Sequence, residues 1–204
     1  MGRKKTVSDA TLLDVAREAF IKEGIGASTK SIARQAGISE AVIFQRFASK
    51  DDLFFAAMIP PPASLNEVLR KSRSRGRALV EKVTLAMLDY CRATMPVLLQ
   101  LMVHPGFSFE EFARRHPDTA MIVLRRELVQ FLADQIRQGQ IGRHVDPGAA
   151  ALLIWSTANT IAFFERMGAH DGKFNPEVIH KTIEAMWDGL APHGEAGKRD
   201  AGKD

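Results

Sequence analysis

Apolar residues recur along this chain three or four positions apart, which is the spacing of amphipathic helices. The first helical pattern runs over 8–23 and ends at Gly24 and Gly26. Two shorter patterns follow at 29–36 and 39–47, and another short helix begins after Ser49. The first three patterns predict a small domain closed by three helices. The apolar positions of the first helix are Leu12, Leu13, Ala16, Ala19 and Phe20.

The two short patterns at 29–36 and 39–47 predict a helix-turn-helix. Thr29 is expected to cap the first helix and Ser39 the second, because hydroxyl side chains accept bonds from free amides at helix starts. Gly37 lies where the chain must turn sharply, which favours a residue that tolerates positive φ. Ile43 and Phe47 lie four apart and are expected to face the core. The opposite side of this second helix carries Glu40, Ala41, Phe44 and Gln45.

Beyond this region, three consecutive prolines at 60–62 interrupt any helix and predict a domain boundary. Helical patterns resume from Ala63 and run over 78–103, 118–138, 146–167 and 175–190. Pro96 is expected to kink or split the 78–103 helix. We therefore predict an all-α fold with a helix-turn-helix domain at 1–58 and a helical domain at 63–191. Residues 192–204 are rich in Gly, Ala and charge, and are expected to be disordered.

Charge and cysteine usage narrow the function class. The formal net charge is +4, with +2 in residues 1–58, +4 in 59–104 and −2 in 105–204. This modest basic excess is typical of a specific DNA-binding dimer rather than a protein that coats nucleic acid. The single cysteine, Cys91, excludes an internal disulfide, predicts a packed thiol and fits a reducing cytoplasm. The charged N-terminus predicts no signal peptide, and the seven-residue apolar stretch 149–155 is taken as too short for a membrane span.

The N-terminal pattern resembles the DNA-binding domain of the tetracycline-repressor (TetR) family of transcription regulators over about residues 8–58. The resemblance implies an all-α protein whose C-terminal helical domain binds an effector and dimerises. It also implies a cytoplasmic, non-enzymatic protein that binds a palindromic operator in double-stranded DNA. The residues that carry the resemblance are Ala19, Phe20, Gly24, Thr29, Ile32, Ala33, Ala36, Gly37, Ile38, Ser39, Phe44, Phe47, Ser49, Lys50 and Leu53.

The resemblance also implies individual DNA contacts. Thr29, Lys30 and Lys50 would contact phosphates, and Arg46 would lie near a phosphate or a base edge. The family usually has tyrosine where this chain has Phe44, which can contact a thymine methyl or simply pack. The groove-facing residues would be Ser39, Glu40, Ala41, Val42, Phe44 and Gln45.

Two of these side chains could read bases directly. Gln45 can pair with adenine, and Glu40 can accept from cytosine, although Glu40 is equally well explained as an acid in the first helical turn. A basic tail, Arg3-Lys4-Lys5, precedes the domain and could meet phosphates.

Effector and dimer contacts are expected in the helical domain. Aromatic and methionine side chains suit an adaptable apolar pocket, and they suit an ordinary core equally well. The candidate pocket residues are Leu98, Met102, Phe107, Phe109, Phe112, Met121, Phe131, Trp155 and Phe163. The last two helices are expected to pair with their copies in a second subunit, through Trp155, Asn159, Phe163, Ile179, Ile183, Met186 and Trp187.

The pattern does not favour an enzyme. Six scattered histidines show no zinc-ligand spacing, and no glycine-rich phosphate loop or nucleophile elbow occurs. No metal or cofactor is expected. The alternative is a helical interaction module that uses its basic face to bind a protein partner. The basic segment 70–77 could contact phosphate or an acidic partner, or it could be a solvated loop between helices. We favour a repressor released by an apolar or amphipathic effector, while the effector, the operator and the regulated genes are not encoded in the pattern.

Overall fold

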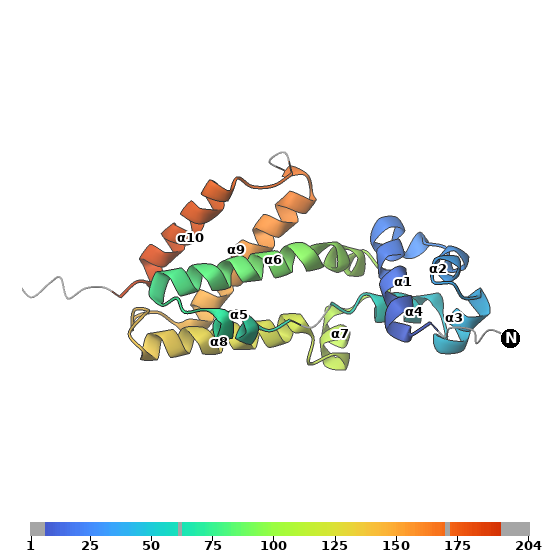
Figure 1. Ribbon diagram of the computed structural model, residues 1–204, viewed down its shortest axis with the longest axis horizontal. Helices are drawn as coiled ribbons and strands as arrows, with labels where there is room; N and C mark the ends of the chain where they lie inside the picture. The colour runs from blue at the N-terminus through green and yellow to red at the C-terminus, as the bar shows by residue number, and fades with distance from the viewer. Residues whose placement is uncertain (1–6, 61–62, 170–171, 193–204) are drawn as a thin grey trace, which may run out of the picture. The chain divides into compact units, whose positions relative to one another are not determined.

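The computed structural model describes residues 7–60, 63–169 and 172–192, and these residues form helices and connections without a strand. The predicted all-α class is therefore confirmed. The basic residues 3–5 and residues 193–204 of the predicted disordered tail lie outside the described residues. The α-helices, labelled in Figure 1, are α1 (Asp9–Glu23), α2 (Thr29–Gln35), α3 (Glu40–Arg46), α4 (Lys50–Ala57), α5 (Leu65–Lys71), α6 (Gly76–Met102), α7 (Phe109–Arg115), α8 (Ala120–Arg137), α9 (Pro147–Arg166) and α10 (Pro176–Leu190). A short 3-10 helix, η1 (Gly24–Gly26), follows α1.

The chain divides into two compact units that are not consecutive in sequence. The first comprises residues 1–61 and 94–119, and the second comprises residues 62–93 and 120–204. The break at 61/62 falls among the prolines that predicted a boundary. The segment 94–119, which we assigned to the helical domain, packs with the N-terminal helices instead. The last third of α6, residues 94–102, and all of α7 belong to the first unit, which interrupts the predicted continuous 63–191 domain.

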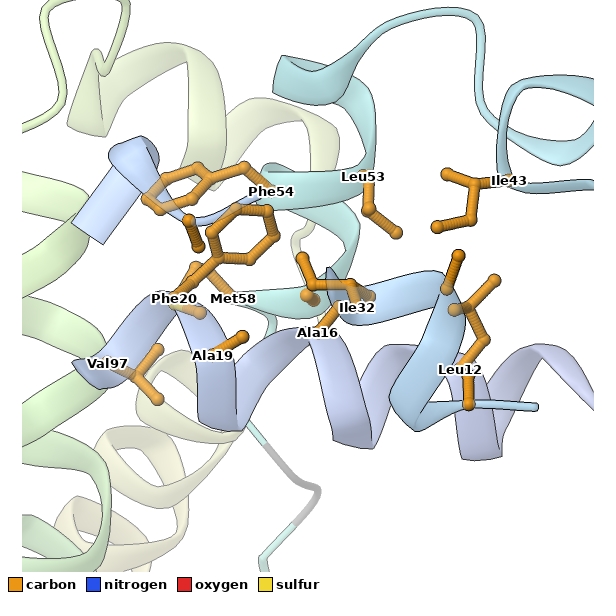
Figure 2. Close-up of a cluster of buried hydrophobic side chains, with 14 of the residues drawn as sticks. Leu12, Ala16, Ala19, Phe20, Ile32, Ile43, Leu53, Phe54, Met58 and Val97 are labelled. Carbon is orange, nitrogen blue, oxygen red and sulfur yellow. The ribbon is translucent and has the colours of Figure 1, made fainter. Parts of the chain in front are cut away.

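That N-terminal core is built around two phenylalanine rings in edge-to-face contact (Figure 2). Phe20 of α1 and Phe54 of α4 are fully buried, and their ring centroids lie 5.1 Å apart in an edge-to-face arrangement. His104 stacks on Phe54 at 4.7 Å, and its Nδ1 accepts a hydrogen bond from the Gly106 amide at 3.1 Å. The core thus joins α1 and α4 to the end of α6. Its other labelled members are Leu12, Ala16, Ala19, Ile32, Ile43, Leu53, Met58 and Val97.

The turn between α2 and α3 forms as the sequence predicted. Gly37 has φ +71°, in the left-handed region that favours glycine, and the Ile38 amide donates to the Ala33 carbonyl at 3.0 Å. The predicted caps need correction. Ser28, not Thr29, caps α2 by accepting from the Ser31 amide, and the Ser39 hydroxyl accepts no α3 amide although Ser39 holds the N-cap position. Serine and threonine are both favoured N-cap residues, so the sequence does not show which of the neighbours Ser28 and Thr29 is the cap. The backbone geometry shows that it is Ser28.

The second unit is held together by buried apolar faces and by ion pairs between α6 and the last helices. Arg92 of α6 makes a bidentate pair with Glu165 of α9, with both N–O distances at 2.8 Å. The Arg92 hydrogen bonds lower the pKa of the Glu165 carboxyl, which also accepts from the Phe174 amide at 3.1 Å. Arg77 of α6 reaches Glu184 of α10 at 3.0 Å. These pairs fix α9 and α10 against α6 within this unit.

Cys91 lies on the buried side of α6 and is 2 % exposed. Burial raises the pKa of its thiol from 9.0 to about 12, because the apolar surroundings disfavour the thiolate. Since the thiolate is the reactive form, Cys91 is a packing residue rather than a redox sensor, as its sequence context predicted.

Two expectations, about helix α6 and helix α9, need revision. Helix α6 continues through Pro96, so this proline does not split it, and the residues on either side, Met95 and Val97, are buried. Helix α9 has 20 residues and is long and apolar enough to cross a membrane by length and composition, so counting only the unbroken run 149–155 was too strict. One such helix is weak evidence for a span, because a core helix passes the same test.

Candidate nucleic-acid interface and effector region

Helix α3 separates its buried and exposed sides cleanly. Ile43 is fully buried in the core, whereas Ala41, Phe44 and Gln45 are exposed, with Phe44 46 % accessible. Ser39, just before the helix, is exposed, and Val42 is half-buried at the edge. The predicted groove-facing residues therefore form one continuous ridge with Phe44 and Gln45 at its crest. An α-helix can enter the major groove of B-DNA, which is about 12 Å wide.

Thr29 and Glu40, both predicted to meet DNA, are bonded to each other. The Thr29 hydroxyl donates to the Glu40 carboxylate at 2.5 Å, in a partly buried position between α2 and α3. This bond holds the start of α3 against the start of α2. It uses one of the two carboxylate oxygens, Oε1, so a bond from cytosine to Glu40 would fall on the other oxygen.

The two lysines predicted to bind phosphate lie at helix starts: Lys30 is the second residue of α2 and Lys50 is the first residue of α4. Lys30 is exposed and Lys50 is half-buried. Ser49 caps α4 by accepting from the Asp52 amide at 3.0 Å, so the N-terminal turn of α4 is well ordered where Lys50 begins it. Among the described residues neither lysine forms an ion pair. Both ammonium groups are therefore available to an anion.

Arg46 has partners within the protein. Its Nη1 donates to the Val7 carbonyl at 2.8 Å and pairs with Asp9 at 3.0 Å, and its side chain is 20 % exposed. A direct contact between Arg46 and DNA remains a prediction. In the structure this side chain is bonded to residues at the start of α1.

The nine residues predicted to line an effector pocket are divided between the two units. Leu98, Met102, Phe107, Phe109 and Phe112 belong to the N-terminal unit, whereas Met121, Phe131, Trp155 and Phe163 belong to the second unit. Met102 and Phe109 point into solvent, and Phe107 and Phe112 pack against the N-terminal core. The prediction grouped aromatic and methionine residues by type, and residue type does not reveal to which core a side chain belongs.

The second unit has open hollows on both sides of α5, which lies against α8. One, of about 500 Å³, is lined by α5, by Met87 and Tyr90 of α6, and by Leu124 of α8. The other, of about 530 Å³, includes Leu69, Leu79 and Phe131 with polar residues of α8. Only Phe131 was among the predicted pocket residues. The sequence missed the rest, Met87, Tyr90 and Leu124 among them, because residue type does not show which side chains of α5, α6 and α8 surround one hollow.

Helix α5 is itself fixed by Glu127 of α8. The Glu127 carboxylate accepts from the Ser64 hydroxyl at 2.9 Å, from the Leu65 amide at 2.7 Å and from the Asn66 side chain at 3.0 Å. These bonds satisfy donors at the start of α5. The basic segment 70–77 follows, as the end of α5, a connection and the start of α6; within it Lys71 pairs with Glu67 and Arg77 with Glu184.

The predicted dimer residues fall on two different faces. Ile179, Ile183 and Met186 of α10 are buried in the chain's own core, which removes them from any surface offered to a partner. Trp155, Asn159 and Trp187 are half-buried, and Asn159 donates to the Trp155 carbonyl. Phe163 alone is well exposed. The apolar face left open lies mainly on α9 and comprises Leu152, Leu153, Phe163, Phe164, Met167 and, from α10, Val178.

Within residues 7–60, 63–169 and 172–192, no cluster of three or more His, Cys, Asp or Glu could hold a metal ion. The fold and its exposed helix define a class of protein, the all-α helix-turn-helix transcription regulators with a second helical domain. Residues 12–57 match the sequence profile of the family described as "Bacterial regulatory proteins, tetR family". Its N-terminal domain is therefore that of the tetR family.

Solved structures with the same fold cover nearly the whole chain. A protein of unknown function from Rhodococcus sp. RHA1 matches with a TM-score of 0.71 and 23 % identity over 94 % of this chain and 100 % of its own. The regulator FadR from Bacillus subtilis, in complex with stearoyl-CoA, gives 0.65 and 17 % over 89 % and 99 %. NalD, the secondary repressor of a multidrug efflux pump in Pseudomonas aeruginosa, gives 0.56 and 17 % over 91 % and 97 %. At these identities the likeness establishes the fold.

Proposed function

We propose that this chain is a cytoplasmic, non-enzymatic transcription repressor. It binds a palindromic operator as a homodimer and leaves it when a small apolar or amphipathic molecule binds. The observation that carries DNA binding is the two-sided α3 helix: Ile43 is buried while Ala41, Phe44 and Gln45 stand exposed, within the stretch that matches the tetR family. Lys30 and Lys50, without ion pairs in the described chain, would hold the phosphates on either side.

The proposal is tested by selecting duplexes from a random pool and measuring binding to the enriched sequence at several salt concentrations. Specific binding predicts at least about a thousandfold preference over a scrambled duplex, and a steep fall of affinity with salt. Equal affinity for both duplexes would exclude a sequence-specific regulator. It would favour the interaction-module alternative.

Gln45 and Lys50 are predicted to play different roles on DNA. Gln45→Ala should weaken binding about 5- to 150-fold to the enriched duplex and relax preference at one base step, because only base contacts carry sequence information. Lys50→Ala should weaken binding to all duplexes and reduce the salt slope by about one per subunit. Fluorescence anisotropy against a panel of single-step variants measures both. An unchanged salt slope for Lys50→Ala would contradict its phosphate contact.

We place the effector in the hollow between α5, α6 and α8, because it is lined mainly by apolar atoms of Met87, Leu124 and their neighbours. FadR, which shares the fold, was solved with stearoyl-CoA, so that compound is a suitable first probe. The ring of Trp155 lies 6.5 Å from Tyr90, which lines the hollow. Trp155 emission in a Trp187→Phe variant therefore offers a binding signal.

Filling this hollow should block the effector. Ala86 lines it, and Ala86→Phe is expected to lower the affinity for a bound probe at least about tenfold while leaving operator binding intact. The matched control is Ala93→Phe, the same substitution at an exposed position of the same helix. Equal affinity in both variants would place the effector elsewhere.

A further inference from the structure

The hollow of about 530 Å³ between α5, the start of α6 and α8 has no part in the proposed function. All of its lining residues lie in the second unit, and none of them lines the hollow assigned to the effector. Its volume falls within the range of sites that hold small molecules, about 300–1,000 Å³. It is therefore a separate space of a size that a ligand can fill.

A buried carboxamide, that of Gln135 on α8, faces this hollow. The residue is only 6 % exposed, and no hydrogen bond within the described part of the chain uses its side chain. Its backbone carbonyl, in contrast, accepts from the amides of Gln140 and Ile141. A buried amide without a partner is costly, because it loses its hydration and gains nothing in return. The carboxamide of Gln135 must therefore be satisfied by what fills the hollow.

The other polar side chains of the lining are engaged or solvated. The Glu127 carboxylate already accepts three donors at the start of α5. Asp134 accepts from the side chain of Gln130 at 3.0 Å. Arg126 and Gln138 are exposed, so water hydrates them. Within this lining, the buried carboxamide is the group whose hydrogen bonds are left for a ligand.

The rest of the lining selects the body of the ligand. Leu69 of α5, Leu79 of α6 and Phe131 of α8 supply apolar surface, against which a flat ring can pack. One arginine and two carboxylates line the hollow, which gives it a formal charge of −1. That charge does not attract an anion. An uncharged ring compound fits both properties.

A carboxamide presents an N–H donor beside a C=O acceptor. Its complement is an edge on which a ring N–H lies beside a ring C=O, as in a lactam or a cyclic imide. We propose that this hollow is a second ligand site, which takes an uncharged ring compound whose amide-type edge pairs with the carboxamide of Gln135. The site is separate from the effector hollow and does not depend on DNA binding.

Two probes test the amide pairing on the unmodified chain. Carbostyril is a flat, uncharged bicyclic lactam, and its N-methyl derivative lacks only the lactam N–H. Isothermal titration calorimetry should give carbostyril a dissociation constant below about 1 mM. The N-methyl derivative should bind at least about tenfold more weakly, because Oε1 of Gln135 is then buried without a donor.

Gln135→Met tests the residue itself, since it removes the carboxamide and keeps the length of the side chain. The variant should bind carbostyril at least about tenfold more weakly, and it should no longer distinguish the two probes. Gln140→Met is the matched control, because it makes the same change just after α8 at a side chain outside this lining. It should leave both affinities unchanged. Ala86→Phe, which fills the effector hollow, should also leave them unchanged.

Equal affinity of the two probes for the unmodified chain would overturn the inference, because no amide edge would then be recognised. So would a lack of carbostyril binding, equal losses in Gln135→Met and Gln140→Met, or a loss in Ala86→Phe that places the probe in the effector hollow. Thermal unfolding shows which variants are folded, and the two-probe comparison decides even if Gln135→Met does not fold. A chain that prefers no duplex would refute the proposed function and leave this site unaffected.

Discussion

Replacing Phe54 by alanine is expected to lower the free energy of unfolding of the N-terminal unit by about 3–5 kcal/mol. Phe54 is fully buried and touches three other rings: Phe20 at 5.1 Å, Phe55 at 5.5 Å and His104 at 4.7 Å between centroids. Removing the ring loses the free energy gained by burying it and leaves a cavity between α1, α4 and the end of α6. DNA affinity should fall with it, because α3 is presented only by the folded unit.

The matched control for this prediction is Phe44→Ala. It makes the same chemical change on the exposed ridge, so it should alter stability by less than about 1 kcal/mol while weakening DNA binding. Urea unfolding followed by circular dichroism measures the first quantity and anisotropy the second. A loss below about 1.5 kcal/mol for Phe54→Ala would mean that the edge-to-face pair of Phe20 and Phe54 does not hold this core together.

The double substitution Phe163→Glu/Met167→Glu is expected to produce a folded monomer that binds the palindromic duplex at least about a hundredfold more weakly. Both side chains are exposed in the single chain, at 38 % and 63 %, on the open apolar face of α9. Charges there cost little in the monomer but would be buried unpaired in a dimer. Two unlinked subunits then bind two half-sites without the gain in effective concentration that a dimer provides.

Sedimentation at about 10 µM, with the wild type for comparison, reports the assembly state. Leu85→Glu is the control, because Leu85 is equally exposed at 38 % but lies on α6. It should leave assembly and DNA affinity unchanged. A wild-type chain that sediments as a monomer, or a double variant that remains a dimer, would show that this face does not pair.

The helix-turn-helix could be predicted from sequence because its determinants are local. The glycine at 37, the apolar spacing of Ile32, Ala33 and Ile43, and the serines near helix starts each specify a backbone conformation over a few residues. Even the errors here are small, such as assigning the α2 cap to Thr29 rather than its neighbour Ser28.

The effector region and the pairing surface were less predictable because they depend on which side of a helix meets which neighbour. The apolar stripe of α10 was assigned to a partner, yet Ile179 and Ile183 are used to cover the chain's own core. Residues 94–119 look like part of the helical domain in sequence, but they complete the N-terminal unit. Periodicity reveals that a face is apolar and does not identify what covers it.

The buried thiol on α6 has a practical consequence for following this protein in solution. With a pKa of about 12, roughly one Cys91 in ten thousand or fewer is ionised near neutral pH, so maleimide probes find almost no nucleophile in the native chain. One cysteine introduced at an exposed site can therefore carry a fluorophore or spin label while Cys91 stays in place. Paired labels on two subunits would then report the distance between their recognition helices as ligand is added.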